Sequence, residues 1–363
     1  VEATPLKVTP YIPVPRGDKM KIGLLSSPFI DTPPRRYGGL EQVVADLGEA
    51  LAEMGHDVTV FASDNSAVRG CKIVPFGPAL EKVQIDWIQA EKQAYEKIKD
   101  LLQDFEIING MNWFGFEYLA KSKNPKLNVC HTHHGGANPE WWCRSKPPFK
   151  LNFIAISKHM QQVYAQQGIS SRFVHNGINL GKYPFSENHG DRFLFLSRIS
   201  RIKAPHVAIQ VAKQAGIELD VAGATNFVDD PSYVEQVKNA CDGKQIRFLG
   251  EVSHEEKLKL LQGAAGLLVT GKWGEPFGLH ILESLAVGSP VVAFKDGGIV
   301  ETMEDGKTGF LCDNEAEMVS AVSRLNDINR RDCRERVEKH FTREIMAKAY
   351  ESLYRSIISG DSW

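Results

Sequence analysis

The stretch K-W-G-E-P-F-G-L-H-I-L-E-S-L-A-V-G-S-P-V-V-A-F, residues 272–294, has the order of a loop, a helix and a buried strand. Small and polar residues predict a loop over 271–276. Apolar residues at helical spacing then predict a helix that begins at Gly278 or Leu279. The run P-V-V-A-F is typical of a strand covered on both faces. Because another apolar run ends just before 271, the stretch predicts a strand–helix–strand unit of a parallel sheet.

The same alternation recurs along the chain in two series. Apolar runs of the first series stand at 21–26, 57–62, 106–109, 127–131 and 153–157. Runs of the second series stand at 193–197, 219–223, 246–250, 266–270 and 290–294. Amphipathic stretches separate them, so we expect an α/β protein with two doubly wound, Rossmann-like parallel sheets. Ligands of such sheets bind beyond the carboxyl ends of the strands, which places the chemistry in a cleft between the domains.

The segment between the two series, 176–191, is rich in Gly, Pro and Asn and is a predicted linker. We therefore expect a first domain over 20–180 and a second over 181–340. The residues before them, 1–19, form a Pro-rich leader without the apolar core of a signal peptide.

The bulk composition narrows the classes of function. A formal net charge of -2 gives no field that would gather nucleic acid over a whole surface. No apolar run approaches the roughly 20 residues that span a bilayer. The six cysteines are dispersed and form no C-x-x-C pair, which favours reduced thiols and a cytoplasmic protein.

Two carboxylates flank the Pro-Phe-Gly turn of the opening stretch. Glu275 precedes the predicted helix and Glu283 lies about one turn inside it, so both can face the cleft. Carboxylates suit the vicinal hydroxyls of a ribose or hexose. The N–H groups of Phe277, Gly278 and Leu279, at the helix start, suit an anion. The competing interpretation is that Glu275 only complements the helix dipole and that Glu283 is a solvated surface residue.

Two further loops carry candidate ligand groups. Arg198 and Lys203 lie between a predicted strand and helix, where a diphosphate would fit, and Arg201 between them could substitute. A charged surface loop is the competing interpretation. Gly38 and Gly39 follow the first strand and would let the backbone approach a ligand closely, although they form no G-x-G-x-x-G fingerprint.

A third group of candidates follows the strand over 127–131, in C-H-T-H-H-G-G. A metal site is the less favoured interpretation here, because the spacing fits no standard ligand set. A histidine that points into the cleft and bonds a ligand is the preferred interpretation, with His133 and His134 both open. The following loop carries Trp141, Trp142 and Arg144, which could contact a sugar or substrate or could pack between the domains.

Taken together, these motifs resemble the family-4 retaining glycosyltransferases with the GT-B fold, over nearly the whole chain from Met20. The matching segments are R-Y-G-G-L-E to V-T-V-F-A-S at 36–63, H-N-G-I-N at 175–179, S-R-I-S-R-I-K-A at 197–204, E-P-F-G-L-H-I-L-E at 275–283, G-S-P-V-V-A-F-K-D-G-G-I-V-E at 288–301 and D-G-K-T-G-F-L at 305–311. Ser197, Ala204 and Asn179 depart from the family pattern, and they leave the donor preference open.

The resemblance implies a role for each candidate. Donor-binding groups would be Gly38, Gly39, Arg198, Lys203, Glu283 and the N–H groups of Phe277, Gly278 and Leu279. Catalytic groups would be Arg198 and Lys203 on the diphosphate, Glu275 on the donor sugar and His134 near its reacting face. His133, Trp141, Trp142 and Arg144 would be acceptor-side candidates on the first domain. The last segment, 341–363, would be a helix that crosses back to that domain.

The implied reaction is transfer of a hexose from a nucleoside diphosphate sugar to an acceptor hydroxyl with retention, as in EC 2.4.1.-. We favour a UDP-sugar over a GDP-sugar, with no bound cofactor or metal. Front-face attack is preferred over double displacement on Glu275. Two alternatives are a sugar-nucleotide 2-epimerase of the same fold and a non-catalytic sugar-nucleotide-binding protein. The acceptor, whether a small molecule, glycan or lipid-linked, and the oligomeric state are not specified by the sequence.

Overall fold

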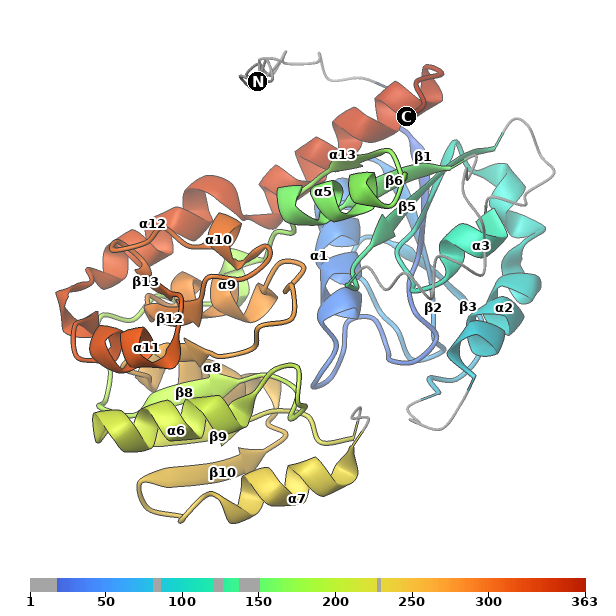
Figure 1. Ribbon diagram of the computed structural model, residues 1–363. Helices are drawn as coiled ribbons and strands as arrows, with labels where there is room; N and C mark the ends of the chain where they lie inside the picture. The colour runs from blue at the N-terminus through green and yellow to red at the C-terminus, as the bar shows by residue number, and fades with distance from the viewer. Residues whose placement is uncertain (1–17, 81–85, 120–126, 137–150, 227–229) are drawn as a thin grey trace.

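The structure is a computed structural model that describes residues 18–80, 86–119, 127–136, 151–226 and 230–363. Nearly all of the predicted leader and the acceptor-side candidates Trp141, Trp142 and Arg144 lie outside these residues. The described chain forms two α/β units side by side, each built around one parallel sheet (Figure 1). The prediction of two Rossmann-like parallel-sheet domains is confirmed.

The first sheet has seven strands in the order β3-β2-β1-β4-β5-β6-β7, and every described pairing in it is parallel. Its strands are β1 (Lys21–Leu25), β2 (Asp57–Ala62), β3 (Lys72–Pro75), β4 (Ile107–Gly110), β5 (Asn128–His133), β6 (Asn152–Ala155) and β7 (Ser171–Phe173). Its helices are α1 (Gly39–Glu53), α2 (Trp87–Ile98), α3 (Gly115–Leu119) and α5 (Lys158–Gln166). The order reverses beside β1, which opens a crevice at the carboxyl ends of β1 and β4.

The second sheet has six strands in the order β10-β9-β8-β11-β12-β13, again with parallel pairings. Its strands are β8 (Phe193–Leu196), β9 (Leu219–Ala222), β10 (Ile246–Gly250), β11 (Leu267–Val269), β12 (Val291–Phe294) and β13 (Gly309–Cys312). Its helices are α6 (Pro205–Ala215), α7 (Pro231–Asn239), α8 (His254–Gly263), α9 (Leu279–Ala286), α10 (Ile299–Thr302), α11 (Glu315–Val322) and α12 (Arg330–His340).

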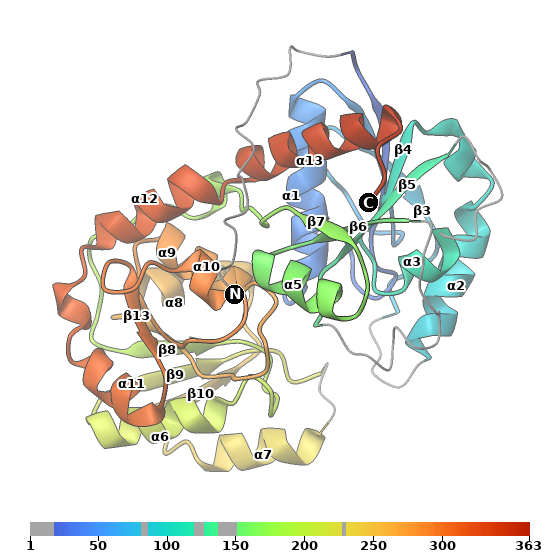
Figure 2. The same ribbon diagram turned by 45° about the horizontal axis from the view of Figure 1, so that its top comes forward.

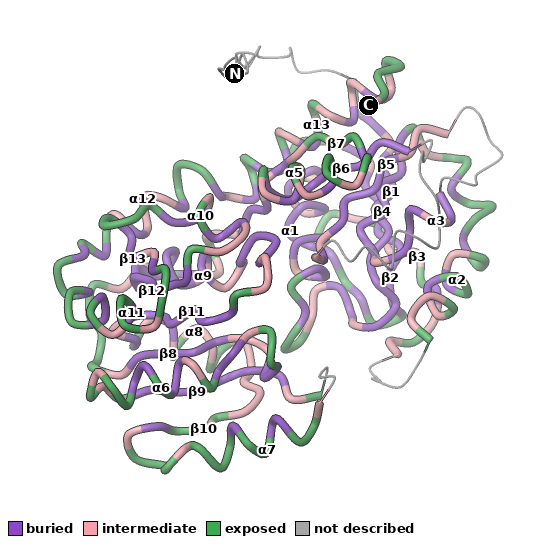
Figure 3. The backbone as a smooth tube through the Cα atoms, in the orientation of Figure 1, coloured by how far each residue is buried: buried purple, intermediate pink, exposed green. Residues whose placement is uncertain are grey.

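The central strands are largely buried, whereas the edge strands β3 and β7 of the first sheet are not (Figure 3). All four residues of β8, β9 and β12 are buried, which is why they read as continuous apolar runs in the sequence. The edge strands β3 and β7 contain no buried residue and carry Lys72 and Arg172. The sequence pattern did not predict these two strands, because a short edge strand needs only one covered face.

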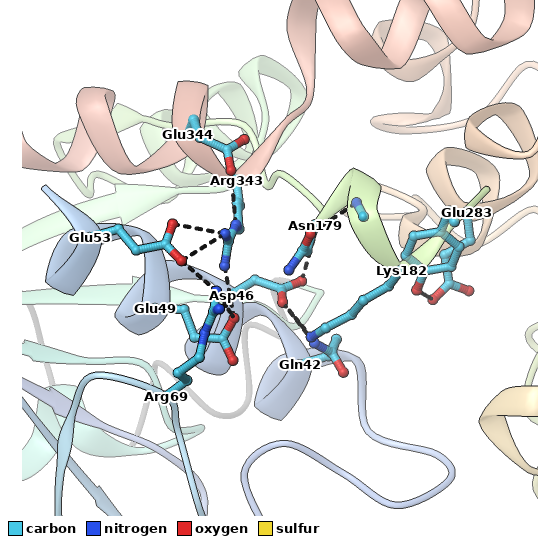
Figure 4. Close-up of polar contacts among 12 residues, drawn as sticks. Gln42, Asp46, Glu49, Glu53, Arg69, Asn179, Lys182, Glu283, Arg343 and Glu344 are labelled. Carbon is cyan, nitrogen blue, oxygen red and sulfur yellow. Dashed lines mark hydrogen bonds and ion pairs between the residues drawn. The ribbon is translucent and has the colours of Figure 1, made fainter. Parts of the chain in front are cut away.

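The last helix, α13 (Arg343–Ile358), leaves the second domain and packs across α1 of the first (Figures 1 and 2). The Tyr354 hydroxyl accepts a hydrogen bond of 2.8 Å from the Asn109 amide, and the Tyr350 hydroxyl lies 3.2 Å from Thr132 Oγ1. The Arg343 guanidinium bonds Glu49 and Glu53 on α1 at 2.8 Å each (Figure 4). The chain therefore crosses between the domains twice, after β7 and again between α12 and α13.

A second polar contact binds the first crossover to α1. Lys182, in the short turn that follows 175–179, donates to Asp46 Oδ1 at 2.9 Å (Figure 4). Asp46 is almost fully buried in the middle of α1. Burial by itself raises the pKa of this carboxyl above its ordinary value, against the attraction of Lys182. Both crossovers are thus held to carboxylates of one helix.

Candidate functional site

The loops that follow β8, β11 and β12 meet at the carboxyl edge of the second sheet. They face the glycine loop and the end of β5 in the first domain. A Cβ atom built on Gly39 would lie 3.4 Å from Leu279 Cδ1, and one built on Gly136 would lie 3.1 Å from Trp273 Cζ3. The two domains thus contact each other across a cleft at the start of α9.

On the second-domain side of this contact, Lys203 and Glu275 form an ion pair. Lys203 donates to Glu275 Oε2, and the Trp273 indole N–H donates to the same oxygen at 3.1 Å. The Lys203 ammonium also lies 4.5 Å from the centroid of the Trp273 ring. Burial by itself would raise the pKa of Glu275, but the charge of Lys203 and the neighbouring donors outweigh it and hold the pKa below its ordinary value. Glu275 is therefore a carboxylate at neutral pH.

His280, on the first turn of α9, completes this group. With Lys203 and Glu275 it lines a small pocket between the ends of β8 and β11. Burial lowers the pKa of His280 to about 4, so its imidazole is neutral at pH 7. The group therefore has one cation, one anion and neutral hydrogen-bonding partners.

Glu283 has a different set of partners. Tyr183 donates its hydroxyl to Glu283 Oε1 at 2.7 Å, and Lys257 donates to the same oxygen at 2.6 Å. Burial by itself would raise the pKa of Glu283, and Lys257 with the Tyr183 hydroxyl holds it below its ordinary value. The two glutamates thus pair with different lysines, Glu275 with Lys203 and Glu283 with Lys257. His280 lies between them, close enough for both carboxylates to act on its charge.

The turn between the two glutamates has the predicted form. The helix α9 begins at Leu279, with Gly278 as its N-cap at φ 91°, a left-handed value that favours glycine. Phe277 is buried just before the cap. In the first turn the Ile281 N–H bonds the Gly278 carbonyl at 3.0 Å. Ser157, at the N-terminus of α5 in the first domain, donates to the Pro276 carbonyl at 2.7 Å.

The three basic residues of the loop after β8, residues 197–204, have different surroundings. Lys203 is in the central pair, and Arg198 lies at the start of the same loop, close enough for its charge to act on the Tyr37 hydroxyl of the glycine loop. Arg201 instead donates to Asp230 at 3.0 Å and lies 4.6 Å from the Tyr233 ring centroid. Arg198 and Lys203 therefore lie on the side of the glycine loop and of Glu275, whereas Arg201 is paired with Asp230.

Gly38 and Gly39 lie where the first domain meets the second. Gly38 has φ 154° and is the N-cap of α1; a Cβ there would lie 2.7 Å from Pro34 Cβ and 2.9 Å from Glu41 Oε2. Gly39 faces Leu279 across the cleft. Any side chain at Gly38 would displace the loop, and at Gly39 it would press against α9.

The histidines of β5 differ in their surroundings. His133 is buried with its ring 6.3 Å from Trp113 and 6.5 Å from Phe116, centroid to centroid. His134 is only partly buried, although its Nε2 is shielded and has no hydrogen-bond partner among the described residues. Burial lowers the pKa of His133 to about 4 and of His134 to about 3, so both are neutral at pH 7. In the described ranges, no three His, Cys, Asp or Glu side chains gather as metal ligands.

Several site residues were not identified from the sequence. Trp273 and His280 lie within 272–294, close in sequence to Glu275. That closeness is the signal by which they could have been identified. Tyr183 and Lys257 come from the linker and from α8, and nothing in their local sequence connects them to Glu283.

Within the described part of the chain, no helix is long and apolar enough to cross a membrane.

Family models match the two halves of the chain in order. The model described as Glycosyltransferase Family 4 matches residues 37–182, and the model described as Glycosyl transferases group 1 matches residues 184–340. The boundary between them falls at 183, inside the predicted linker. Together the two models cover the glycine loop, the cation-bearing loop 197–204 and both glutamates.

Relatives match over most of their length at low identity. The chain is 25% identical to N-acetyl-alpha-D-glucosaminyl L-malate synthase of Bacillus anthracis, over 94% of this chain and 98% of that protein. AviGT4, a glycosyltransferase involved in avilamycin A biosynthesis, superposes with a TM-score of 0.76 at 21% identity, covering 95% of this chain and 99% of AviGT4. Anabaena HepE, solved with UDP and glucose, has a TM-score of 0.74 at 18% identity, covering 93% and 100%.

Proposed function

The chain belongs to the family-4 glycosyltransferases with the GT-B fold, and from that premise we propose that it transfers a hexose from a nucleoside diphosphate sugar to an acceptor hydroxyl with retention. The first domain would take the acceptor and the second the donor. The observation that carries the proposal is a pair of partnered carboxylates on either side of the start of α9. Glu275 pairs with Lys203. Glu283 pairs with Lys257 and Tyr183.

This arrangement matches the parts of a sugar nucleotide. Glu283 would accept hydrogen bonds from the ribose hydroxyls, and Glu275 from the hydroxyls of the donor sugar. The diphosphate between them would lie at the start of α9, with Lys203 and Arg198 as its cations and Gly38 and Gly39 above it. The pKa of each glutamate is held below its ordinary value, which supports acceptance of hydrogen bonds by charged carboxylates.

The reaction would place negative charge on the leaving diphosphate and positive charge on the sugar. Arg198 and Lys203 would already be in position before the bond breaks. They would stabilise the negative charge that develops on the leaving diphosphate, which is the main electrostatic task of such a site. They would do so without a metal. Glu275 already shares Oε2 between Lys203 and Trp273, which supports a role as a hydrogen-bond acceptor over that of a free nucleophile. We therefore retain front-face attack, in which the leaving phosphate takes the acceptor proton.

Two further assignments concern the base of the donor and the histidine that contacts its sugar. We favour a UDP-sugar, since HepE, a fold neighbour, was solved with UDP and glucose and with UDP-glucose; a GDP-sugar is the second choice. His134 would contact the sugar near its reacting face, because His133 is enclosed by aromatic rings. His133 would then support His134 from behind rather than meet the acceptor.

A thermal-shift screen with UDP, GDP, ADP and their common sugars tests the donor assignment. Binding to the native state raises the melting temperature by mass action, so UDP and one UDP-sugar should give a concentration-dependent rise. Absence of a shift with every nucleotide at millimolar concentration would sink the proposal. Release of UDP only after an acceptor is added distinguishes transfer from epimerisation, which would give a new sugar nucleotide with no acceptor.

A further inference from the structure

Asp296 lies in the loop between β12 and α10 and bonds the backbone of the loop that carries Glu275. Its Oδ2 atom accepts three consecutive N–H groups, from Trp273 at 3.1 Å, Gly274 at 2.8 Å and Glu275 at 2.9 Å. Successive N–H groups that converge in this way form an anion-binding concavity. The chain fills this concavity with its own carboxylate, so these three donors are not available to a phosphate.

The two residues after Asp296 dock on the same loop. Gly298 donates its N–H to the Glu275 carbonyl at 2.7 Å. A Cβ on Gly297, which has φ 52°, would lie 2.3 Å from the Glu275 carbonyl oxygen, and one on Gly298 would lie 2.4 Å from the Pro276 carbonyl oxygen. The backbones of D-G-G and G-E-P are therefore in contact with no room for a side chain between them.

These contacts fix the backbone positions of Trp273 and Glu275, whose side chains both contact Lys203. The Trp273 ring lies under the Lys203 ammonium, and the Glu275 carboxylate accepts from both residues. Residues 271–276 are otherwise an irregular loop between β11 and α9, with no strand or helix bonds to hold them. An error of about 1 Å in such a group can cost up to about a hundredfold in rate.

We propose that Asp296 is a positioning residue for transfer: it fixes the backbone of 273–275 so that Glu275 and Trp273 meet Lys203 at the donor sugar. Asp296 acts through that loop and touches neither the sugar nor the nucleotide. The inference rests on the proposed function, because Glu275 is taken as the group that bonds the donor sugar. It predicts an effect on turnover that is separate from nucleotide affinity.

The test compares Asp296→Ala and Asp296→Asn with a matched control, Asp242→Ala. Asp242 is an exposed aspartate of the same domain whose Oδ1 accepts two backbone N–H groups, from Lys244 at 2.8 Å and Ile246 at 3.0 Å. It stands before β10, at the amino end of the strand and so at the opposite edge of the sheet from the cleft. Amide hydrogen exchange of 273–275, UDP affinity, and turnover with the best nucleotide sugar of the thermal-shift screen are measured for each protein.

We expect Asp296→Ala to lose amide protection at 273–275, to keep its UDP affinity within about twofold, and to lose between about tenfold and a hundredfold in kcat. Asp296→Asn keeps an acceptor oxygen and should recover part of both the protection and the rate, whereas Asp242→Ala should match the wild type. Retained protection at 273–275, or lost protection with unchanged kcat, overturns the inference alone. A wild-type protein that turns over none of the donors overturns the proposed function and this inference with it.

Discussion

The ammonium of Lys203 and the carboxylate of Glu275 form an ion pair in the cleft, and each is no more than 15% exposed. An incoming diphosphate would compete with Glu275 for Lys203. The donor sugar would in turn offer its hydroxyls to Glu275. The pair thus keeps each buried charge next to an opposite one before the donor arrives. Donor binding would replace the Lys203–Glu275 contact with two contacts to the ligand, one from each residue.

Removal of the cation tests this exchange. Lys203→Met keeps the length of the side chain and removes its charge. We expect turnover to fall by about a hundredfold or more, because one electrostatic contact to a developing oxyanion contributes on that scale. The pKa of Glu275 should rise, since burial is then opposed only by weaker neighbours. Initial-rate kinetics with saturating donor provide the measurement.

The control for this change is Lys213→Met on α6. Lys213 donates to the Ala240 carbonyl at 3.1 Å on the exposed side of the same domain, so its loss should leave turnover unchanged. Circular dichroism and the melting temperature of both variants show whether the fold persists. Full turnover by folded Lys203→Met would remove this residue from the diphosphate.

The nucleotide end of the site depends on Glu283. Glu283→Gln keeps a carbonyl oxygen for Tyr183 but removes the charge that attracts Lys257. We expect the affinity for free UDP to fall by about tenfold or more, because hydrogen bonds to a charged acceptor contribute about 1.5–3 kcal/mol. Isothermal titration gives the dissociation constant directly. Equal affinity in the variant and the wild type would contradict the ribose assignment.

The sequence predicted the two parallel sheets and the candidate loops well, and it predicted the partners of those loops poorly. Glu275 and Lys203 each follow a buried strand, so the rule that ligands bind at the carboxyl ends of strands was enough to place them near each other. Asp296 also follows a strand, yet its role as acceptor of three N–H groups depends on the shape of a neighbouring loop. Tyr183 and Lys257 reach Glu283 from 100 and 26 residues away in the chain, and spacing alone carries no signal of such contacts.

The first crossover connects α1 to Glu283 through two adjacent residues. Lys182 pairs with Asp46 on α1 (Figure 4). Tyr183 donates to Glu283. We expect Lys182→Met to weaken UDP binding severalfold although Lys182 does not touch the site, because the turn that positions Tyr183 loses its anchor. Tyr183→Phe should give a loss of similar size with its ring still buried. Fluorescence or calorimetric titration with UDP measures both effects.

A hydroxyl outside the cleft provides the control for Tyr183. Tyr118 donates to the Ile88 carbonyl at 2.7 Å in the first domain, so Tyr118→Phe removes an equivalent bond without contact to Glu283. Its UDP affinity should equal that of the wild type. A Lys182→Met protein with wild-type affinity would show that the crossover does not influence the nucleotide site.

Glu91 on α2 predicts a pH dependence of stability. It is buried, and it accepts the N–H groups of Trp113 at 2.8 Å and Phe114 at 2.7 Å, which hold the loop beside His133. Burial raises its pKa to about 8, against the effect of these two bonds. The folded protein therefore keeps a proton that the unfolded chain, with an ordinary carboxyl, releases near pH 4.5. The contribution is fully present below that pH and is lost as the pH rises through about 8.

The free energy of unfolding should thus fall across this window, with a slope from Glu91 that approaches about 1.4 kcal/mol per pH unit. Glu91→Gln removes the titrating group, so it should remove that slope. Its amide keeps only one oxygen for the N–H groups of Trp113 and Phe114, so the variant should be less stable than the wild type at pH 5. Glu96→Gln changes an exposed glutamate on the same helix and should keep the wild-type slope. Denaturant unfolding of the three proteins between pH 5 and pH 8.5 measures the difference, and parallel slopes for wild type and Glu91→Gln would show that Glu91 is charged in the fold.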